Sequence, residues 1–549
     1  MARRKIPFVG GFRDPDIYGV NFSLPVNWQP SFYENREDLF LSMVPSPGTE
    51  RFYNVPPGIE VTNSEYRGAI VMNGSIYVVV GDKLLKLSPT ISSNELTGFS
   101  TAELGTLGTN TGQVQMAYST DFELGIVDGV HLYSYKASLT TSPETPFKTV
   151  SLTTTQLQKA NDIEFLDQRF IITIKDSQTY YVSPATFAAN SSRLRTAYSV
   201  NDWAFANITA RADTLKGVKV NNLNFYLFGT RVIETWTDAG VAGNPFRRIN
   251  SQVYDVGAAS TDSIAQATGP NGEDITVFLA SDTKGALNVM MLGHGGVQSI
   301  ANKAIQGFLA DNIRSKQDAI GAMFRDKNDL FYQITFPTDN ITLVYDFERQ
   351  EWHQRKALDG GRHHANVFVH FDEEDFRGGY NFVGDYNSTR MYRFSSDIYT
   401  DALDGTTFCP AGTKINGSVL QADTNIENTA ITIHKSYSAP YLSSPEEKKI
   451  IINRVELNCV QGTGRNDYDD RTYTEDKEPN IRLSASRDKG RAFETIHQGS
   501  VGKVGFYKQR TRYHRFGHSH DGWVLKTESY SKQPIIMISM ILDYEVGDE

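Results

Sequence analysis

One pattern of short apolar runs recurs along most of the chain. Each unit has three runs rich in β-branched and aromatic residues, and a polar or glycine-containing turn joins the first two. In the first unit, Asn73 and Gly74 separate Ala69–Met72 from Ile76–Val80. Asn-Gly between apolar runs is a strong hairpin signal, because a type I′ turn needs positive φ at two successive residues. We therefore predict that these runs are antiparallel strands.

The turns between the first two runs are regularly spaced. They fall near residues 74, 121, 168, 222, 273, 327 and 375, so that successive turns lie 47 to 54 residues apart. A repeat of this length with three or four strands per unit is typical of β-propeller blades. We predict an all-β fold with a β-propeller of about seven blades, in a range of six to eight, over residues 59–400. The alternative is a multi-sheet β protein whose turns only look regular.

The repeat is absent from both ends of the chain. Residues 1–58 are punctuated by proline and poor in strand signals, which predicts an extended N-terminal arm. Residues 401–413 are rich in Gly, Asp and Thr and predict a linker. Alternating polar and apolar residues return within 414–549, where we expect a C-terminal β-sandwich-like domain. An acidic loop over 466–479 interrupts its strands.

The charge of the chain is unevenly distributed. The net charge is −10, but residues 481–532 carry +7 and the remainder carries −17. A protein that grips nucleic acid along its whole surface needs clustered Lys and Arg, so the overall balance argues against that class. The basic segment has three readings: a solvated strand face, a DNA-binding face or a protein interface. We expect a protein interface, and its residues are Lys508, Arg510, Arg512 and Arg515.

Cysteine content and hydropathy indicate the compartment. Only Cys409 and Cys459 are present, which is too few for a disulfide framework and fits folding in a reducing cytosol. The longest apolar run, near Pro534–Leu542, is about half of the ~20 residues that span a bilayer. The N-terminus has basic residues but no apolar stretch of a signal peptide behind them. We expect a soluble protein with no stable membrane insertion.

The usual catalytic motifs are missing from the sequence. There is no phosphate-binding loop, dinucleotide fingerprint, His-Glu-x-x-His pair or nucleophile elbow. His518 and His520, close to His514, would share one strand face, but they have no Cys or carboxylate at fixed spacing. His363 and His364 are a weaker pair, because neighbours on a strand point to opposite faces. No catalytic residue, cofactor or metal site is predicted.

Other polar patterns also favour structural roles. The acidic stretches 372–375 and 467–470 lack the Gly and bidentate Glu of a calcium-binding loop, and we expect them to be solvated. Paired carboxylates for glycoside cleavage are recognised by their spatial pairing, and nothing in the sequence selects a pair. Ser486–Phe493 resembles the Asp-box hairpin of sialidase-like propellers, in which Asp488 would cap the turn and Gly490 would take positive φ. Such boxes are structural.

Several segments resemble one family, the packaged-DNA stabilisation or tail nozzle (hub) proteins of short-tailed bacteriophages. The resemblance begins at Leu24-Pro25-Val26-Asn27, followed by Pro47-Gly48 and Pro56-Pro57-Gly58. It continues through the block from Asn224 to Ser260, the block Leu330–Trp352, and Ser486–Gly490 with the Arg-rich strand after it. The matching blocks are spread over most of the chain.

The resemblance implies a structural role in the virion tail. It implies a homohexameric ring below the portal-adaptor (head-to-tail connector) ring, assembled in the host cytoplasm. Its bore would conduct genomic double-stranded DNA without binding it specifically. Its other partners would be tail plug, needle, spike or fibre proteins. Because acidic surfaces repel phosphates, we expect an acidic or neutral bore and an outward-facing basic segment.

Two other functions compete with this reading. The first is a phage adhesin, a propeller that binds or cleaves surface glycans and has convergent carboxylates, Arg and aromatics at one mouth. The second is a DNA-retaining protein that uses the face formed by 481–532.

Overall fold

The computed structural model describes most of the chain. Within residues 2–6, 24–35, 38–372, 379–402, 414–415, 418–419, 430–462 and 478–547, short gaps lie at 94, 141–143, 151–158, 186–190, 197–202, 242, 270–271, 282–285, 328, 358–359, 440, 443–447, 504 and 532. Most of the predicted linker and of the acidic loop, both acidic stretches except Asp372, and Cys409 lie outside the described residues.

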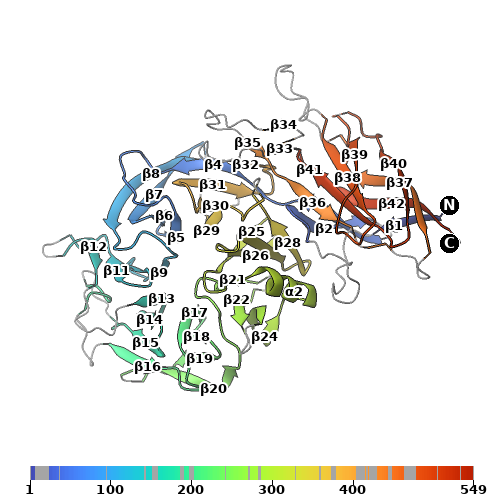
Figure 1. The fold of residues 1–549 in the computed structure, drawn as a ribbon. Coiled ribbons are helices and arrows are strands. Elements are labelled where there is room, and N and C mark those ends of the chain that lie inside the picture. The colour runs from blue at the N-terminus through green and yellow to red at the C-terminus, as the bar shows by residue number, and fades with distance from the viewer. Residues whose placement is uncertain are drawn as a thin grey trace.

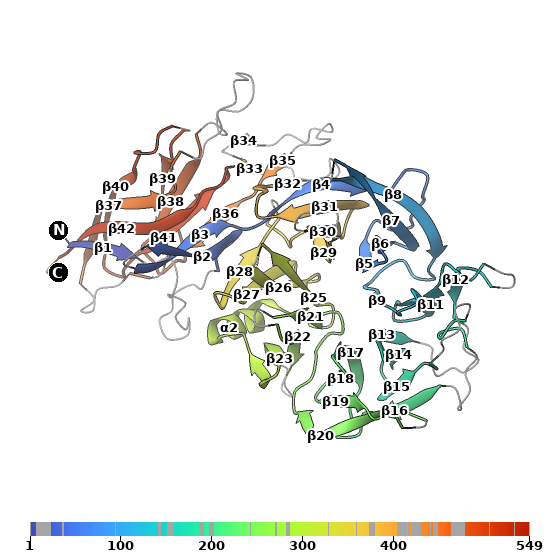
Figure 2. The same ribbon diagram turned by 180° about the vertical axis from the view of Figure 1, so that it is seen from behind.

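The repeat predicted from the sequence is a β-propeller. Seven four-stranded antiparallel sheets surround a common centre (Figures 1 and 2). Strands β5, β9, β13, β17, β21, β25 and β29 lie towards that centre (Figure 1). The blades are: β5 (Tyr66–Met72), β6 (Ser75–Val80), β7 (Lys83–Ser92) and β8 (Glu95–Thr106); β9 (Gln115–Tyr118), β10 (Leu124–Val127), β11 (Leu132–Tyr135) and β12 (Phe147–Thr149); β13 (Ala160–Leu166), β14 (Arg169–Ile174), β15 (Thr179–Val182) and β16 (Ala204–Asn207); β17 (Leu215–Asn221), β18 (Asn224–Gly229), β19 (Ile233–Asp238) and β20 (Phe246–Tyr254); β21 (Ala265–Thr268), β22 (Asp274–Ser281), β23 (Leu287–Gly293) and β24 (Gly296–Ser299); β25 (Ile320–Asp326), β26 (Asp329–Phe336), β27 (Ile341–Asp346) and β28 (Glu351–Arg355); β29 (Ala365–Phe371), β30 (Tyr380–Asp385), β31 (Arg390–Ser395) and β4 (Gly48–Asn54).

The seven turns used to find the repeat occupy equivalent places. Each lies, in sequence, between the first and second strands of a blade as they are ordered above, and the turn near residue 375 falls outside the described residues. In blade one, Met72 pairs with Ser75 across a two-residue turn, and the φ angles of Asn73 and Gly74 are 47° and 68°. These are the positive values that a type I′ turn requires. The β-propeller fold is thus confirmed, and its blade number is seven.

The propeller core consists of layers between blades. Seven buried apolar clusters are present among the described residues, and each draws its side chains from two neighbouring blades. The second strand of blade one, β6, is buried along its whole length, because both of its faces contact other blades. This explains why Ile76–Val80 reads as a continuous apolar run and not as an alternating one.

An N-terminal strand completes the last blade. β4 pairs with β31, so that strands from opposite ends of the propeller sequence close the ring. The expectation that residues 1–58 form a strand-poor arm is wrong, because the segment contains β1 (Ala2–Ile6), β2 (Trp28–Asn35), β3 (Asp38–Pro45) and β4. β1, β3 and β4 pair with strands hundreds of residues away, which local sequence patterns do not reveal, whereas β2 pairs with β3, its neighbour in the chain, and the sequence analysis did not anticipate that pair.

Two further sheets lie beside the propeller, at the upper right of Figure 1. Their buried side chains form a single apolar cluster, to which Trp28 and Met43 also belong. Both chain ends lie at the far edge of this part, where β1 pairs with β42 (Figure 1). We propose that the two sheets are the sandwich-like domain expected from the sequence, with three N-terminal strands added. The first contains β1, β2, β3, β37 (Ile450–Cys459), β40 (Thr511–Ser519) and β42 (Met537–Val546); the second contains β36 (Lys435–Ser438), β38 (Asn480–Ser486), β39 (Thr495–Ser500) and β41 (Val524–Ser529).

The remaining described elements are small. Helix α2 (Lys303–Asn312) connects blades five and six, and its N-cap Asn302 accepts a hydrogen bond from the Ile305 amide. Two short antiparallel pairs are formed by β32 (Thr400–Ala402) with β35 (Ala430–Thr432) and by β33 (Lys414–Ile415) with β34 (Ser418–Val419). In the part of the chain that the structure describes, no helix has the length and apolar character needed to cross a membrane.

The turn geometry generates a stability prediction. Gly74→Val should lower the stability by about 1–3 kcal/mol, because a β-branched residue at a φ of 68° is strained. Thermal melting of the purified chain measures the effect. Gly98→Val is the matched control, since Gly98 lies in β8, lacks a positive φ and leaves open space where a Cβ would lie. Equal melting temperatures for the two variants would contradict the type I′ assignment.

Candidate functional site at the junction of the propeller and the C-terminal sheets

The segment Leu24–Asn27 lies between the propeller and the C-terminal sheets. On one side, the Asn27 amide donates to the Gln354 carbonyl at 2.9 Å and the Gln354 amide donates to the Pro25 carbonyl at 2.8 Å. On the other side, Val26 and Ser436 exchange two backbone hydrogen bonds of 2.7 and 3.0 Å. Gln354 belongs to the outer strand of blade six and Ser436 to β36. The segment therefore hydrogen-bonds to both units at once.

Asn27 is the most constrained residue of this junction. It is 3% exposed and its φ is +53°, a left-handed conformation that Asn tolerates better than most residues. Its side-chain amide donates to the carbonyls of Lys356 and His434 at 2.9 and 2.8 Å. Its side-chain oxygen accepts from the Lys356 amide at 3.0 Å. One side chain thus links three chain segments.

The residues on either side of Asn27 belong to different cores. Leu24 packs in the apolar cluster between blades five and six. Trp28 is fully buried in the cluster of the C-terminal sheets, and its indole N–H donates to the Ile535 carbonyl at 3.3 Å. Within five residues the chain passes from one core to the other. This explains structurally why the Leu-Pro-Val-Asn motif is a recognisable block.

Buried charged side chains surround the junction. Arg355 is 1% exposed, and its guanidinium lies 4.8 Å from the centre of the Phe394 ring. Burial lowers the pKa of Arg355 to about 9 and that of Lys435 to about 8. Burial also raises the pKa of Asp401, against the effect of neighbouring cations. None of these residues belongs to a recognisable motif, and isolated charges within strands normally face solvent, so the sequence alone does not mark them as buried.

The adjacent pair His363 and His364 corrects one expectation. The sequence interpretation placed them on opposite faces of a strand, but they precede β29 and lie outside any strand. Their rings stack with centroids 4.4 Å apart, and both residues are buried. The interpretation was wrong because the two-residue alternation holds only for extended strand backbone. Both rings neighbour Asp401.

Polar contacts cross the centre of the propeller. The Gln115 side chain of blade two donates to Asp262, just before blade five, at 3.0 Å. Asn161 of blade three donates to the Lys216 carbonyl and to Thr261, at 2.6 and 2.9 Å. Burial raises the pKa of Asp262 to about 6. The Gln115–Asp262 bond therefore joins blade two to the segment that enters blade five, whereas the Asn161–Lys216 bond joins neighbouring blades.

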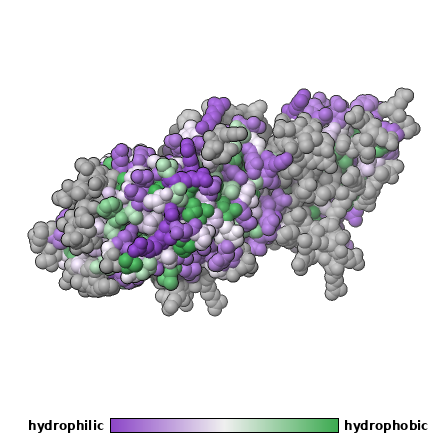
Figure 3. Space-filling model, turned by 90° about the horizontal axis from the view of Figure 1, so that it is seen from below, coloured by the Kyte–Doolittle hydropathy of each residue, from purple (hydrophilic) through white to green (hydrophobic). Residues whose placement is uncertain are grey.

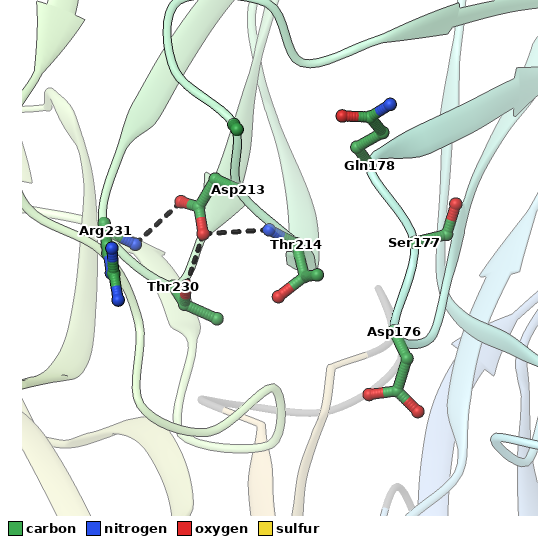
Figure 4. A pocket seen from close by; sticks show the side chains of 8 residues that line it. Asp176, Ser177, Gln178, Asp213, Thr214, Thr230 and Arg231 are labelled. Atoms are coloured by element: carbon green, nitrogen blue, oxygen red, sulfur yellow. Dashed lines mark hydrogen bonds between the residues drawn. The ribbon is translucent and has the colours of Figure 1, made fainter.

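A polar groove of about 600 Å³ lies between blades three and four. Figure 4 shows Asp213 on one wall of the groove, turned towards Thr230 and the backbone of Arg231 and Thr214. The Asp213 carboxylate accepts hydrogen bonds from Thr230 and from the amides of Thr214, Arg231 and Val232. This carboxylate therefore holds two loops together. Asp176, Ser177 and Gln178 line the opposite wall (Figure 4).

The Ser486–Phe493 hairpin has the local geometry proposed for an Asp box. The Asp488 carboxylate accepts from the amides of Arg491 and Ala492 at 3.1 and 2.9 Å. These bonds hold the pKa of Asp488 below its usual range, and the bond from the Ala492 amide has the largest effect. Gly490 has a φ of 87° and donates its amide to the Ser486 hydroxyl at 2.9 Å. The contacts of Asp488 and Gly490 are internal to the turn, whereas the Arg487 guanidinium donates to the Phe516 carbonyl at 2.9 Å.

The four basic residues proposed as an interface lie on β40 and on the loop before it. All four are exposed. Arg510 and Arg512 form ion pairs with Glu456 at 3.4 and 3.1 Å. Arg515 has a φ of 68°, next to a register shift between β37 and β40. For Lys508, as for Arg515, the described residues include no ion-pair partner.

Two exposed aromatic residues adjoin this basic group. Phe506 and Tyr507 are 61% and 66% exposed, and they directly precede Lys508. We call Phe506, Tyr507, Lys508, Arg510 and Arg512, together with Arg515, the basic-aromatic patch. On the propeller, by contrast, hydrophilic side chains predominate among the coloured atoms of the face seen in Figure 3, and hydrophobic ones form small groups.

The chain matches one family model over most of its length. The model is described as Bacteriophage P22 Gp10, beta-propeller, and it matches residues 4–399. The matched range contains all seven blades and the Leu24–Asn27 segment. A comparison with curated proteins finds no match.

Solved structures share a low level of similarity with the chain. The N-terminal domain of Nup159 is 9% identical, with a TM-score of 0.38, and the alignment covers 68% of this chain and 99% of that chain. A chain of the mitotic checkpoint complex is 9% identical, with a TM-score of 0.36, over 63% of this chain and 94% of that chain.

The contacts of Asn27 generate a second stability prediction. Asn27→Ala should destabilise the protein by about 2–4 kcal/mol, because it removes three side-chain hydrogen bonds of ~1 kcal/mol each and leaves Ala in a left-handed conformation. Asn27→Gly should lose less, since Gly accepts the positive φ and only the bonds are lost. Melting temperatures measure both variants against Asn63→Ala, which removes one exposed hydrogen bond at 3.1 Å. If Asn27→Ala had the same melting temperature as the Asn63→Ala control, the role of Asn27 in the junction would be refuted.

Proposed function

The chain belongs to the family of the bacteriophage P22 Gp10 β-propeller, and on that premise we propose that it forms the tail nozzle or hub ring of a short-tailed phage. It is a structural protein of a phage virion. In our proposal, six copies surround a bore below the adaptor ring. The bore conducts the genome during ejection, and a plug or needle protein at the tip retains the DNA until infection. The match over residues 4–399 is the observation that carries the proposal.

The joined architecture of the subunit supports a role in a wall. Residues 24–54 supply the Leu24–Asn27 contacts, two strands of the C-terminal sheet and the closing strand of blade seven. Separation of the two units would break the hydrogen bonds on both sides of that segment. A propeller also leaves only short, protected sheet edges, which limits pairing with stray strands. A conduit that carries densely packed DNA benefits from subunits of this kind.

The propeller axis itself is an unsuitable path for DNA. The Gln115–Asp262 hydrogen bond joins side chains from opposite blades across it. In the proposed assembly the genome therefore passes between subunits and not through any one propeller. The −17 charge outside residues 481–532 favours a bore surface that repels phosphates and does not retain them.

The basic-aromatic patch is the proposed contact with another tail protein. Exposed aromatic rings and Arg side chains are enriched in protein interfaces, because Arg pairs bidentately with carboxylates and stacks on rings. The adaptor, plug, spike or fibre component that it contacts would present an acidic surface. The same charges would suit DNA retention if the patch lined the bore.

The glycan-binding alternative would use a groove such as the one between blades three and four. Its central carboxylate, Asp213, is already engaged by four hydrogen-bond donors, so it has little capacity left for a sugar hydroxyl or for proton transfer. We therefore propose a non-enzymatic function for the chain.

A charge-reversal variant tests the proposed interface. Lys508→Glu with Arg515→Glu should give particles that fail to attach a neighbouring tail component but keep their DNA inside the assembled tail. Negative-stain microscopy and nuclease protection of the packaged genome measure the two properties. These two residues are chosen because, among the described residues, neither takes part in an ion pair, so their reversal leaves the Glu456 pairs intact.

The control carries the same change of charge elsewhere on the C-terminal sheets. Lys489→Glu with Arg491→Glu alters the exposed Asp488 turn and should leave attachment unchanged. Particles of the Lys508/Arg515 variant that attach every component but leak DNA would overturn the interface proposal in favour of a DNA-retaining collar. Cleavage of host polysaccharide by the purified chain would overturn the structural proposal.

A further inference from the structure

His363, His364 and Asp401 form a buried cluster near the junction. The two histidines lie between blades six and seven, and Asp401 lies in β32, directly after blade seven. Their exposed fractions are 3%, 6% and 5%. One potential ligand atom from each residue lies within 4.8 Å of the others. Two imidazoles and one carboxylate from separate parts of the chain thus converge on one interior point.

His364 has no hydrogen-bond partner for either ring nitrogen among the described residues. Both nitrogens are buried, and its ring packs against His363 and against Tyr392, with centroids 4.4 and 5.0 Å away. Buried polar atoms are nearly always paired, because loss of water without a replacement partner is unfavourable. A buried imidazole with two unpaired nitrogens beside a carboxylate therefore points to a ligand between them.

The carboxylate of Asp401 is oriented by a second residue. The hydroxyl of Thr49, in the closing strand β4, donates to one carboxylate oxygen at 3.1 Å. In metal sites, hydrogen bonds of this kind from outside the ligand set hold a ligating carboxylate in place. His363 has one long contact, from the Ala365 amide to Nδ1 at 3.3 Å. The cluster thus offers one oriented carboxylate and two imidazole rings.

We propose that His363, His364 and Asp401 bind a divalent transition-metal ion, and that Zn²⁺ is the ion that fits best. Imidazole nitrogens with one carboxylate are typical Zn²⁺ ligands, whereas Ca²⁺ and Mg²⁺ prefer oxygen-only sites. Tetrahedral bonds of ~2.0–2.2 Å place ligand atoms ~3.3–3.6 Å apart. Side-chain rotations that move the ligand atoms about 1 Å closer would complete the geometry, with water as the fourth ligand.

Two buried cations lower the metal affinity expected of this site. Arg355 and Lys435 both interact electrostatically with Asp401, and Asp326 offsets the charge of Arg355. An added dication would be repelled by them, so the site is weaker than an isolated set of the same ligands. The ion would link the residues just before β29, the first strand of blade seven, to β32, which follows the blade and lies beside β4. Metal binding would then stabilise the closure of the propeller.

Zinc titration of the full-length chain tests this proposal. The chain is first stripped of metal with a chelator, and the chelator is then removed. Calorimetric titration should show that the wild type binds one more equivalent of Zn²⁺ than His364→Ala. Asp401→Asn should lose the same equivalent while it keeps the side-chain oxygen that accepts from Thr49. Zn²⁺ should also raise the melting temperature of the wild type and leave that of both variants unchanged. Asp401→Asn serves as the informative variant if His364→Ala does not fold.

A surface control separates this site from adventitious binding. His518 and His520 are exposed, with ring centroids 6.0 Å apart, and could bind zinc themselves. The His518→Ala/His520→Ala variant should still bind the one equivalent of Zn²⁺ that we assign to the junction. When Co²⁺ replaces Zn²⁺ in this variant, its visible absorption spectrum should show the bands of a four-coordinate ion. Loss of all binding in the surface variant, or equal binding by wild type and both junction variants, would overturn the proposal. So would a wild-type chain that binds no zinc.

Discussion

The closure of the seventh blade is the constraint on which the rest of the structure depends. A β-sheet edge left open is a template for unwanted pairing, and a propeller avoids this only when its first and last blades meet. Here the closing strand is β4, which pairs with β31 across more than 300 residues of sequence. Gly48 at the start of β4 is required by this packing, because a Cβ there would lie 2.5 Å from the Thr400 carbonyl oxygen. The ring therefore closes through the N-terminal segment.

The same segment joins the second part of the protein to the first. Before it reaches blade seven, it passes between blade six and β36 at Val26 and Asn27, and then adds β2 and β3 to the C-terminal sheet. Propeller closure and attachment of the C-terminal sheets therefore depend on the same segment. In the proposed nozzle ring, a force on the C-terminal sheets would pass directly into the propeller. The buried polar groups around Asp401, in contact with Thr49 of β4, lie along this path.

The sequence predicts the parts of this structure that depend on local signals. Turn chemistry such as Asn73-Gly74 located all seven blades, because a hairpin is specified by residues next to one another. The strand β4 and the contacts of Asn27 could not be predicted in this way, since their partners lie 300 to 400 residues away. The cluster of His363, His364 and Asp401 could not be predicted for a related reason. The histidines precede a strand, and the Asp401 carboxylate follows the last blade in the sequence. Only the family resemblance marked Leu24–Asn27 as important, without indicating what it contacts.

Hydrogen–deuterium exchange of the full-length chain, followed by mass spectrometry, measures whether residues 24–54 are an integral part of both units. Such integration predicts that peptides covering Val26–Asn27 and β4 exchange as slowly as those covering β28 and β31, and that they lose protection together on heating, because their backbone hydrogen bonds break in one cooperative opening. Rapid exchange of residues 24–54, while blades one to six stay protected, would contradict it.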